Sequence, residues 1–342
     1  MNNVTRAANS TGVKSSFETD DVINVYASYK GSKYFQDDFT KQDGSTFQSS
    51  PSKYYWPADI SSSNKLTFTA IWGATQVAGS AGQIASMEIP GNKDILVARH
   101  ISEAYEAAPT LNFRHALSQV LVKVKNTNPS LKITITDFQI GYVDKTGAFN
   151  LDESSASDAT DTRETGSQNA SLIPATKWTN TAATAPSSNY SQTLASSVVF
   201  TATNGGTSDN EVVTLGDPWI LLPQTRDASS AAYVTTGSGE VSGSTAPGID
   251  KPYIAIKMTI EGYNGTSSTG TLVTGRWCCW PVSIAWNPGF KYTYTINVGD
   301  GGYEPIDTDN NGTLNPVLGN VIVFNASCTV DAWVDSNTDV SM

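Results

Sequence analysis

Oxygen-bearing side chains recur at alternate positions in residues 307–312, DTDNNG. Asp307, Asp309 and Asn311 would offer oxygen ligands and Gly312 would allow a sharp turn, as at the start of an EF-hand calcium loop. The bidentate glutamate that closes such a loop is missing, because Leu318 occupies its position. Asp, Asn and Gly are also the residues of ordinary turns. The segment therefore predicts a turn, with calcium as the weaker alternative and no metal site expected.

Histidine is scarce, so a Ser-His-Asp arrangement would have to use His100 or His115. The sequence contains no G-x-S-x-G elbow, phosphate loop, H-E-x-x-H motif or dinucleotide fingerprint. His115 stands just before a clearly patterned strand. A histidine in such a position is more often a hydrogen-bonded structural residue than a catalytic base. Carboxylate pairs for glycoside hydrolysis are set by distance in space, but most acids stand in predicted loops. Examples are Asp152, Glu153, Asp158 and Asp161. The sequence predicts neither an enzyme nor a cofactor.

The three cysteines are Cys278, Cys279 and Cys328. Adjacent Cα atoms lie about 3.8 Å apart, which is too close for ordinary disulfide geometry. A bridge from Cys278 or Cys279 to Cys328 stays open. So few cysteines exclude a disulfide-stapled scaffold. Zinc is disfavoured, because the spacing matches no known ligand set.

Tryptophans suggest a second chemistry, since exposed indole rings can stack on sugars. Trp277 and Trp280 flank the paired cysteines, and Trp56 and Trp72 stand elsewhere in the chain. Tryptophans in β-sandwiches are more often core residues. A surface glycan-binding module is therefore an alternative function, which glycan-dependent quenching of tryptophan fluorescence would reveal.

Composition narrows the class of protein further. Of the 342 residues only 15% are charged, and the net charge is −11. Nucleic-acid binding needs a basic stripe, and no Lys/Arg cluster of that kind is present. No apolar run approaches the ~18 residues of a membrane helix. No signal peptide is present either, so the targeting segment of an exported protein would lie upstream of Met1.

Apolar and polar residues alternate along much of the chain, the period of β-strands. Val120, Val122 and Val124, for example, alternate with Lys123 and Lys125. The phase of a second such pattern shifts near residue 137, which predicts a β-bulge. Predicted strands include residues 22–26, 66–72, 94–98, 120–125, 133–142, 198–200, 219–222, 253–260, 290–298, 321–324 and 328–333.

Many short strands with Gly- and Pro-rich connections are typical of sandwiches. Residues 152–197 are rich in Ser, Thr, Ala, Asn and Asp and poor in large apolar residues, which favours a domain boundary there. The predicted fold is all-β, with two sandwich domains in tandem. The first would span residues 1–152 and the second residues 171–342, with a linker at 153–170.

Eight segments, spread over nearly the whole chain, form an ordered set of motifs. They are TRA at 5–7, FETDDVINVYA at 17–27, DILVA at 94–98, FRHALSQV at 113–120, IGY at 140–142, GAFNL at 147–151, WNPGFKYTYTI at 286–296, and the closing run 322–333. No single motif is as specific as a phosphate loop. In their order and spacing, however, these segments resemble the fimbrillin family, the subunits of type V pili.

The resemblance implies two transthyretin-like sandwiches and export as a lipoprotein precursor to the cell surface. It also implies cleavage by an arginine-specific protease, for which Arg6 stands at the expected place, and polymerisation by strand exchange. Partners would be other copies or other fimbrial subunits, the protease, and a host or bacterial surface ligand. Arg6 as a plain surface residue of the N-terminal segment is the alternative.

The donor strand would come from the C-terminal segment. Candidate anchors are Val321, Val323, Cys328, Val330 and Trp333. The alternative is that these residues form ordinary last strands of the second sandwich. The tail after Trp333 is short and polar, so a tip or accessory subunit that accepts a strand without donating one also stays open.

Overall fold

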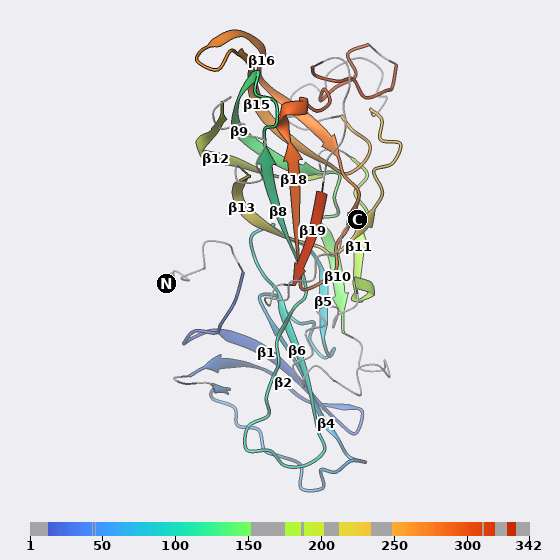
Figure 1. Ribbon diagram of the computed structural model, residues 1–342. Helices are drawn as coiled ribbons and strands as arrows, with labels where there is room; N and C mark the ends of the chain where they lie inside the picture. Colours follow the sequence, from blue (N-terminus) through green and yellow to red (C-terminus); the bar gives the residue numbers. More distant parts are fainter. Residues whose placement is uncertain are drawn as a thin grey trace.

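The computed structural model describes residues 13–42, 44, 46–151, 175–185, 188–201, 212–233, 248–309 and 311–318, and the backbone of 327–332. Figure 1 shows an elongated molecule, with β2 and β4 near one end and β15 and β16 at the other. The described residues form strands and short 3-10 turns without an α-helix. The prediction of an all-β protein is confirmed. No helix among these residues is long and apolar enough to cross a membrane.

A six-stranded antiparallel sheet, here called the N-terminal sheet, has the order β3-β2-β1-β4-β6-β7. Its strands are β1 (Val22–Tyr29), β2 (Ser32–Lys41), β3 (Phe47–Gln48), β4 (Leu66–Trp72), β6 (Leu96–Ser102) and β7 (Arg114–His115). The hairpin between β1 and β2 turns through Lys30 and Gly31, both with positive φ. Two such residues match the right-handed twist of the flanking strands.

The two faces of the N-terminal sheet are covered differently. Phe68 and Trp72 of β4 belong to an apolar cluster that is completed by loop side chains such as Phe17 and Trp56. We call this side the roofed face. Ile71 points the other way, toward a sheet of order β11-β10-β5. Those three strands are β5 (Gln83–Glu88), β10 (Thr146–Asn150) and β11 (Trp178–Thr181).

Two four-stranded sheets form the other half of the molecule, called here the C-terminal sandwich. Their orders are β12-β9-β15-β16 and β13-β8-β18-β19. The strands are β8 (Ser118–Lys125), β9 (Leu131–Gly141), β12 (Asn189–Phe200), β13 (Val213–Leu221), β15 (Tyr253–Tyr263), β16 (Ser268–Pro281), β18 (Phe290–Asn297) and β19 (Ser327–Ala332). The short strands β14 (Thr225–Arg226) and β17 (Ile284–Ala285) pair with each other.

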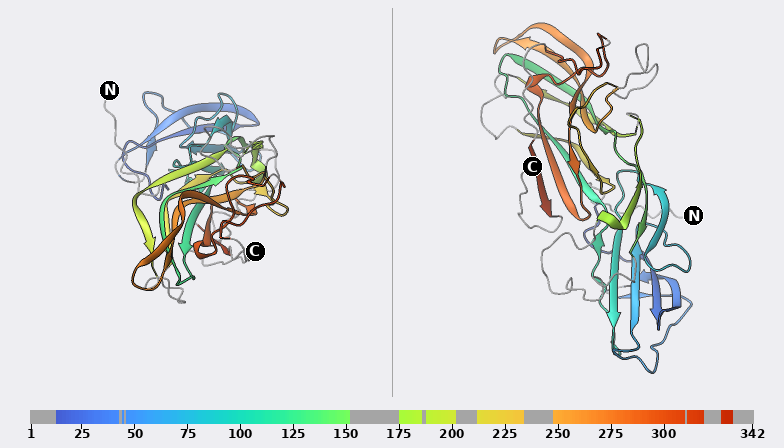
Figure 2. Two further views of the ribbon diagram at one scale, coloured as in Figure 1. Left: turned by 90° about the horizontal axis from the view of Figure 1, so that it is seen from above. Right: turned by 90° about the vertical axis from the view of Figure 1, so that its right-hand side faces the viewer.

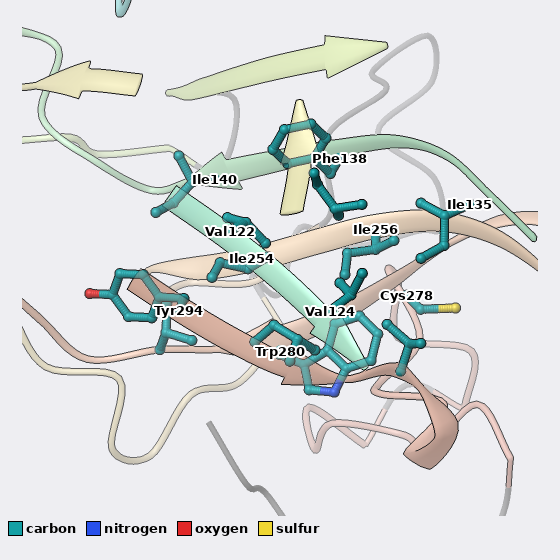
Figure 3. Packing of buried hydrophobic residues seen from close by; sticks show 14 of the residues in the cluster. Val122, Val124, Ile135, Phe138, Ile140, Ile254, Ile256, Cys278, Trp280 and Tyr294 are labelled. Carbon is teal, nitrogen blue, oxygen red and sulfur yellow. The ribbon is translucent and has the colours of Figure 1, made fainter. Parts of the chain in front are cut away.

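The core of the C-terminal sandwich lies between these sheets. Figure 3 shows Val122, Ile140 and Tyr294 pointing into one apolar cluster from different strands. The pairing of β9 with β12 and with β15 skips Thr136. That irregularity confirms the bulge predicted near residue 137.

The sheets mix strands from both sides of the predicted domain boundary. Strands β8 and β9 lie before residue 152, but their partners lie after it. Strand β8 pairs with β13 and β18, and β9 pairs with β12 and β15. Ile220 of β13 packs into the cluster beneath the N-terminal sheet, whereas its neighbour Leu221 packs into the C-terminal sandwich. Alternation along one strand therefore places neighbouring side chains in two separate apolar clusters, one in each half.

Candidate functional site

The edge of one C-terminal sheet is formed by the last described strand, β19. It pairs antiparallel with β18, from Phe290 opposite Ala332 to Thr295 opposite Ser327. On its other side β18 pairs parallel with β8. Among the described residues β19 has no second neighbouring strand. Removing this six-residue strand would leave the backbone N–H and C=O groups along β18 open to another strand.

Strand β18 is held in place by contacts that do not involve β19. Tyr292 and Tyr294 are buried, and their hydroxyls fix the preceding turn. Trp286 Nε1 donates to the Tyr294 hydroxyl at 3.0 Å, and the Asn287 backbone N–H donates to the Tyr292 hydroxyl at 2.8 Å. Because these bonds join β18 to the turn before it and not to β19, they hold β18 in place whichever strand pairs with its edge.

The chain is well anchored just before its C-terminal segment. The Val317 N–H donates to the Gly302 carbonyl at 3.0 Å. Leu318 packs against the sandwich core and over Gly301, where an added Cβ would lie 2.5 Å from Leu318 Cγ. The described chain is therefore held to the sandwich as far as Leu318.

The predicted donor residues are only partly within the described chain. Cys328 stands opposite Tyr294 and Val330 opposite Tyr292 in the β18–β19 register. Val321, Val323 and Trp333 lie outside the described residues. Their role as donors therefore stays a prediction.

Arg6 also lies outside the described residues, but the segment that follows it is tied to the N-terminal sheet. The Lys14 ammonium pairs with Asp21 at 2.6 Å, and the Lys14 N–H donates to Asp94 Oδ2 at 3.2 Å. The Phe17 ring lies 4.8 Å from that of Phe113. Burial raises the pKa of Asp21, but bonds from Lys14 and from the Glu18 N–H outweigh it, so the pKa lies below its ordinary value.

Both histidines have carboxylate partners. His115 Nδ1 lies 2.7 Å from Asp94 Oδ2, and His100 Nε2 lies 3.0 Å from Glu106 Oε1. Burial raises the pKa of Glu106, yet the bond to His100 helps to bring it below its ordinary value. Asp94 also binds the Lys14 N–H, so its pair with His115 connects the N-terminal segment to β7. These contacts match the structural interpretation of the histidines.

The DTDNNG segment forms a loop whose carboxylates bind its own backbone. Asp307 Oδ2 accepts from the Gly312 N–H at 2.8 Å, and Asn311 Nδ2 donates to Asp309 Oδ2 at 2.7 Å. The bond from the Asn315 side chain to Asp309 Oδ1 is the main influence that holds the pKa of Asp309 below its ordinary value, and burial opposes it. Within the described residues no group of three or more His, Cys, Asp or Glu side chains is arranged to hold a metal. The oxygens act as turn acceptors.

Cys278 and Cys279 are free and buried. Burial raises the pKa of the Cys278 thiol to about 12 and that of Cys279 well above its ordinary value. Such thiols act as small apolar side chains rather than as nucleophiles or metal ligands.

The tryptophans are mostly core residues, as the more common interpretation predicted. Trp72 and Trp280 are buried, whereas Trp56 and Trp277 are partly buried. The exposed aromatic side chains are instead tyrosines, which the sequence did not single out. The only sequence signal for them is the run Tyr54, Tyr55, Trp56 in a predicted loop.

A family model described as fimbrillin-like matches residues 5–317. The chain belongs to the fimbrillin-like family. This membership supports a fimbrial subunit at the cell surface that interacts with other fimbrial subunits, and it points to a structural rather than a catalytic role. The resemblance drawn from the ordered motifs is thereby confirmed. No curated protein matches the sequence.

Solved structures of similar proteins include three from Bacteroides species. A fimbrial protein from Bacteroides vulgatus shares 15% sequence identity with the chain, with a TM-score of 0.44 over 91% of this chain and 92% of that one. A provisionally named cell adhesion protein from Bacteroides uniformis shares 16%, with a TM-score of 0.44 over 96% of both chains. Another from Bacteroides ovatus shares 14%, with a TM-score of 0.45 over 94% and 90%.

Proposed function

We propose that this fimbrillin-like protein is a subunit of a type V pilus that polymerises by strand exchange after proteolytic cleavage at Arg6. The observation that supports the exchange step most directly is the position of β19. It is a short edge strand at the C-terminal side of the chain, held on β18 by six register pairs and preceded by an anchor at Leu318. Such a strand can leave without unfolding the core beneath it.

The precursor keeps the strand on its own chain. Docking of β19 on β18 pairs the backbone groups along β18, which would otherwise be open to a strand of another chain. In the proposed exchange, residues after Leu318 swing out, and their alternate side chains enter an apolar groove of the next subunit while the backbones hydrogen-bond. Head-to-tail donation does not close on itself, so it yields a filament.

Cleavage at Arg6 supplies the acceptor groove in this proposal. Removing the segment before Arg6 takes away a strand and exposes unpaired backbone groups beside apolar side chains. The contacts of Lys14 and Phe17 support this sequence of events, because they hold the chain behind the cut. As in the family that the motifs resemble, the precursor would be exported through the outer membrane as a lipoprotein.

The test uses the precursor extended upstream to its export signal, run unboiled on denaturing gels before and after limited arginine-specific proteolysis. A ladder of detergent-resistant oligomers should appear only after cleavage. The Arg6→Lys variant keeps the charge but removes the cut, so it should stay monomeric. Deletion of residues 319–342 should also abolish the ladder, although cleavage proceeds.

A cleaved precursor that stays monomeric under all these conditions would sink the stalk role. It would leave a tip or accessory subunit, or a glycan-binding module, as the function. A ladder that survives the deletion of residues 319–342 would contradict the C-terminal donor while keeping polymerisation.

A further inference from the structure

Four tyrosines stand out from the end of the molecule formed by the N-terminal sheet. Tyr55 is 74% exposed and Tyr105 is 69% exposed, while Tyr34 and Tyr54 are about 40% exposed. The other exposed large hydrophobic side chains among the described residues are aliphatic: Val22 begins β1 of the same sheet, and Val199 and Leu272 belong to the C-terminal sandwich. The exposed side chains of this kind in β2 and in the loops beside it are therefore all aromatic.

Contacts bring these tyrosines together from three segments. The Tyr34 hydroxyl of β2 donates to the Tyr55 carbonyl at 2.6 Å. The loop between β6 and β7 adds Tyr105, whose ring lies 5.6 Å from that of Trp56. The loop between β3 and β4, which carries Tyr55, and the loop between β6 and β7 both lie at the end of the molecule where β2 and β4 are found (Figure 1). We call Tyr34, Tyr54, Tyr55, Tyr105 and Trp56 the tyrosine patch.

The patch is built on rigid supports. Tyr54 stacks on Phe35 of β2, with ring centroids 4.0 Å apart, and donates its hydroxyl to Asp37 at 2.8 Å. Trp56 meets the buried Phe68 edge-on at 6.0 Å. Rings fixed in this way lose little side-chain entropy when something binds to them, so they suit recognition.

The chemistry around the rings matches a polyhydroxylated ligand. A pyranose presents a flat face of C–H groups that an aromatic ring can cover, and hydroxyls at its edge that carboxylate oxygens can accept from. Asp37 accepts from the Tyr54 hydroxyl at the edge of the patch, and Asp59 stands three residues after Trp56 in the same loop. Lys30 pairs with Asp59 at 2.6 Å, so a neighbouring cation already balances that acid. The carboxylate of an acidic sugar would therefore gain little attraction from Lys30.

We propose that the tyrosine patch binds neutral carbohydrate. An aliphatic protein surface fits it less well, because a hydrophobic protein interface mixes aliphatic anchors with its aromatic ones. None of the exposed large aliphatic side chains among the described residues belongs to the segments that form the patch. The inference does not depend on strand exchange. The patch belongs to the N-terminal sheet, whereas β18 and β19 belong to the C-terminal sandwich (Figure 1).

The test is affinity electrophoresis of the full chain in native gels that contain mixed-linkage β-glucan, galactomannan or glycogen. Retardation is expected in at least one neutral polysaccharide. The double variant Tyr55→Ala/Tyr105→Ala should weaken the apparent affinity at least tenfold, while the double Phe variant should retain most of it. Leu272→Ala is the matched control, because it removes a 57% exposed side chain from β16 in the C-terminal sandwich. It should leave the apparent affinity for the polysaccharide unchanged.

Unfolding midpoints in urea must agree among the variants, so that lost binding cannot be a folding defect. No retardation in any of the three gels would overturn the proposal, as would retardation that the double Ala variant leaves intact. Self-association in size-exclusion chromatography that the same variant abolishes, without retardation, would assign the patch to contact between copies.

Discussion

The C-terminal sandwich and the roofed face of the N-terminal sheet bury aromatic rings in two different ways. In the sandwich two sheets face each other, and Trp286, Tyr292 and Tyr294 are almost fully buried between them. On the roofed face one sheet is covered by loops, and rings such as Phe17 and Trp56 are only partly buried. Figure 2 shows the two halves from further directions.

This difference separates stability from recognition. A second sheet supplies packing partners for every inward side chain, so the rings between the two sheets are fully buried in a close-packed interior. A loop roof ends in tips, and the rings at those tips stay in contact with water. The roofed face can therefore carry a binding surface, while the sandwich supports the edge on which β19 lies.

The largest effect should come from deleting a ring inside the sandwich. Trp286 is 1% exposed and donates to Tyr294, so Trp286→Ala should lower the free energy of unfolding by about 3–5 kcal/mol. Urea denaturation followed by circular dichroism measures this. Tyr105→Ala, which removes a ring from the roofed side, should change it by less than about 0.5 kcal/mol. Similar losses for both variants would contradict the comparison.

A mostly buried charged pair should have the next largest effect. Arg226 Nη2 donates to Asp144 Oδ1 at 2.5 Å, and both side chains are mostly buried. Arg226→Met keeps much of the volume but removes that donor, so about 2 kcal/mol of stability should be lost. Asp144 keeps the Ala183 N–H, which limits the loss.

The matched control is Lys30→Met, which breaks the exposed pair with Asp59 near the tyrosine patch. Exposed pairs contribute little, because water screens them. The urea midpoint should not move. A shift as large as that of Arg226→Met would mean that the Lys30–Asp59 pair is shielded from water as well as the Arg226–Asp144 pair is.

Sequence patterns predicted the strands and one bulge but not their partners. The Val120–Val124 alternation and the shift near residue 137 both match the structure. That β8 lies parallel to β18 could not be predicted, because a period of two assigns a face to each residue and not a neighbouring strand. The same limit explains why a polar stretch after residue 152 suggested a domain boundary, although strands before it pair with strands after it.

The candidate surfaces were predictable to different degrees. The C-terminal donor and Arg6 came from resemblance and stay predictions, since only Cys328 and Val330 of those residues lie in a described strand. The tyrosine patch was missed. Its rings come from β2 and from two loops, and only the fold brings Tyr34, Tyr55 and Tyr105 together.

A smaller, pH-dependent effect should come from the N-terminal segment on the roofed side. The pKa of Asp21 lies below its ordinary value, since bonds from Lys14 and the backbone outweigh burial. A carboxyl with a lowered pKa stabilises the fold above its ordinary pKa, and that contribution is lost as the pH falls through the folded value.

Asp21→Asn should therefore cost about 1 kcal/mol at neutral pH. The difference from the unmodified protein should shrink as the pH falls below about 4, because the ordinary pKa of an aspartate lies there. Urea titrations at neutral and at acid pH measure it. A difference that stays constant with pH would show that the charge of Asp21 does not contribute.

The smallest effect is expected from chemical labelling inside the sandwich. Burial raises the pKa of Cys278 to about 12 and that of Cys279 well above its ordinary value, and the thiolate is the reactive form. In a Cys328→Ser variant, iodoacetamide at mildly alkaline pH should leave both cysteines unmodified, as peptide mass spectrometry would show. The same variant in urea should react fully. Cys278 belongs to the cluster between the facing sheets, whereas Cys279 belongs to a separate cluster with the loop residues Tyr233 and Ile249. Labelling of Cys278 in the folded protein would mean that the sandwich opens locally, as loops do, and that its two facing sheets give no more protection than a roof of loops. Labelling of Cys279 alone would keep the comparison, because loops cover that side chain.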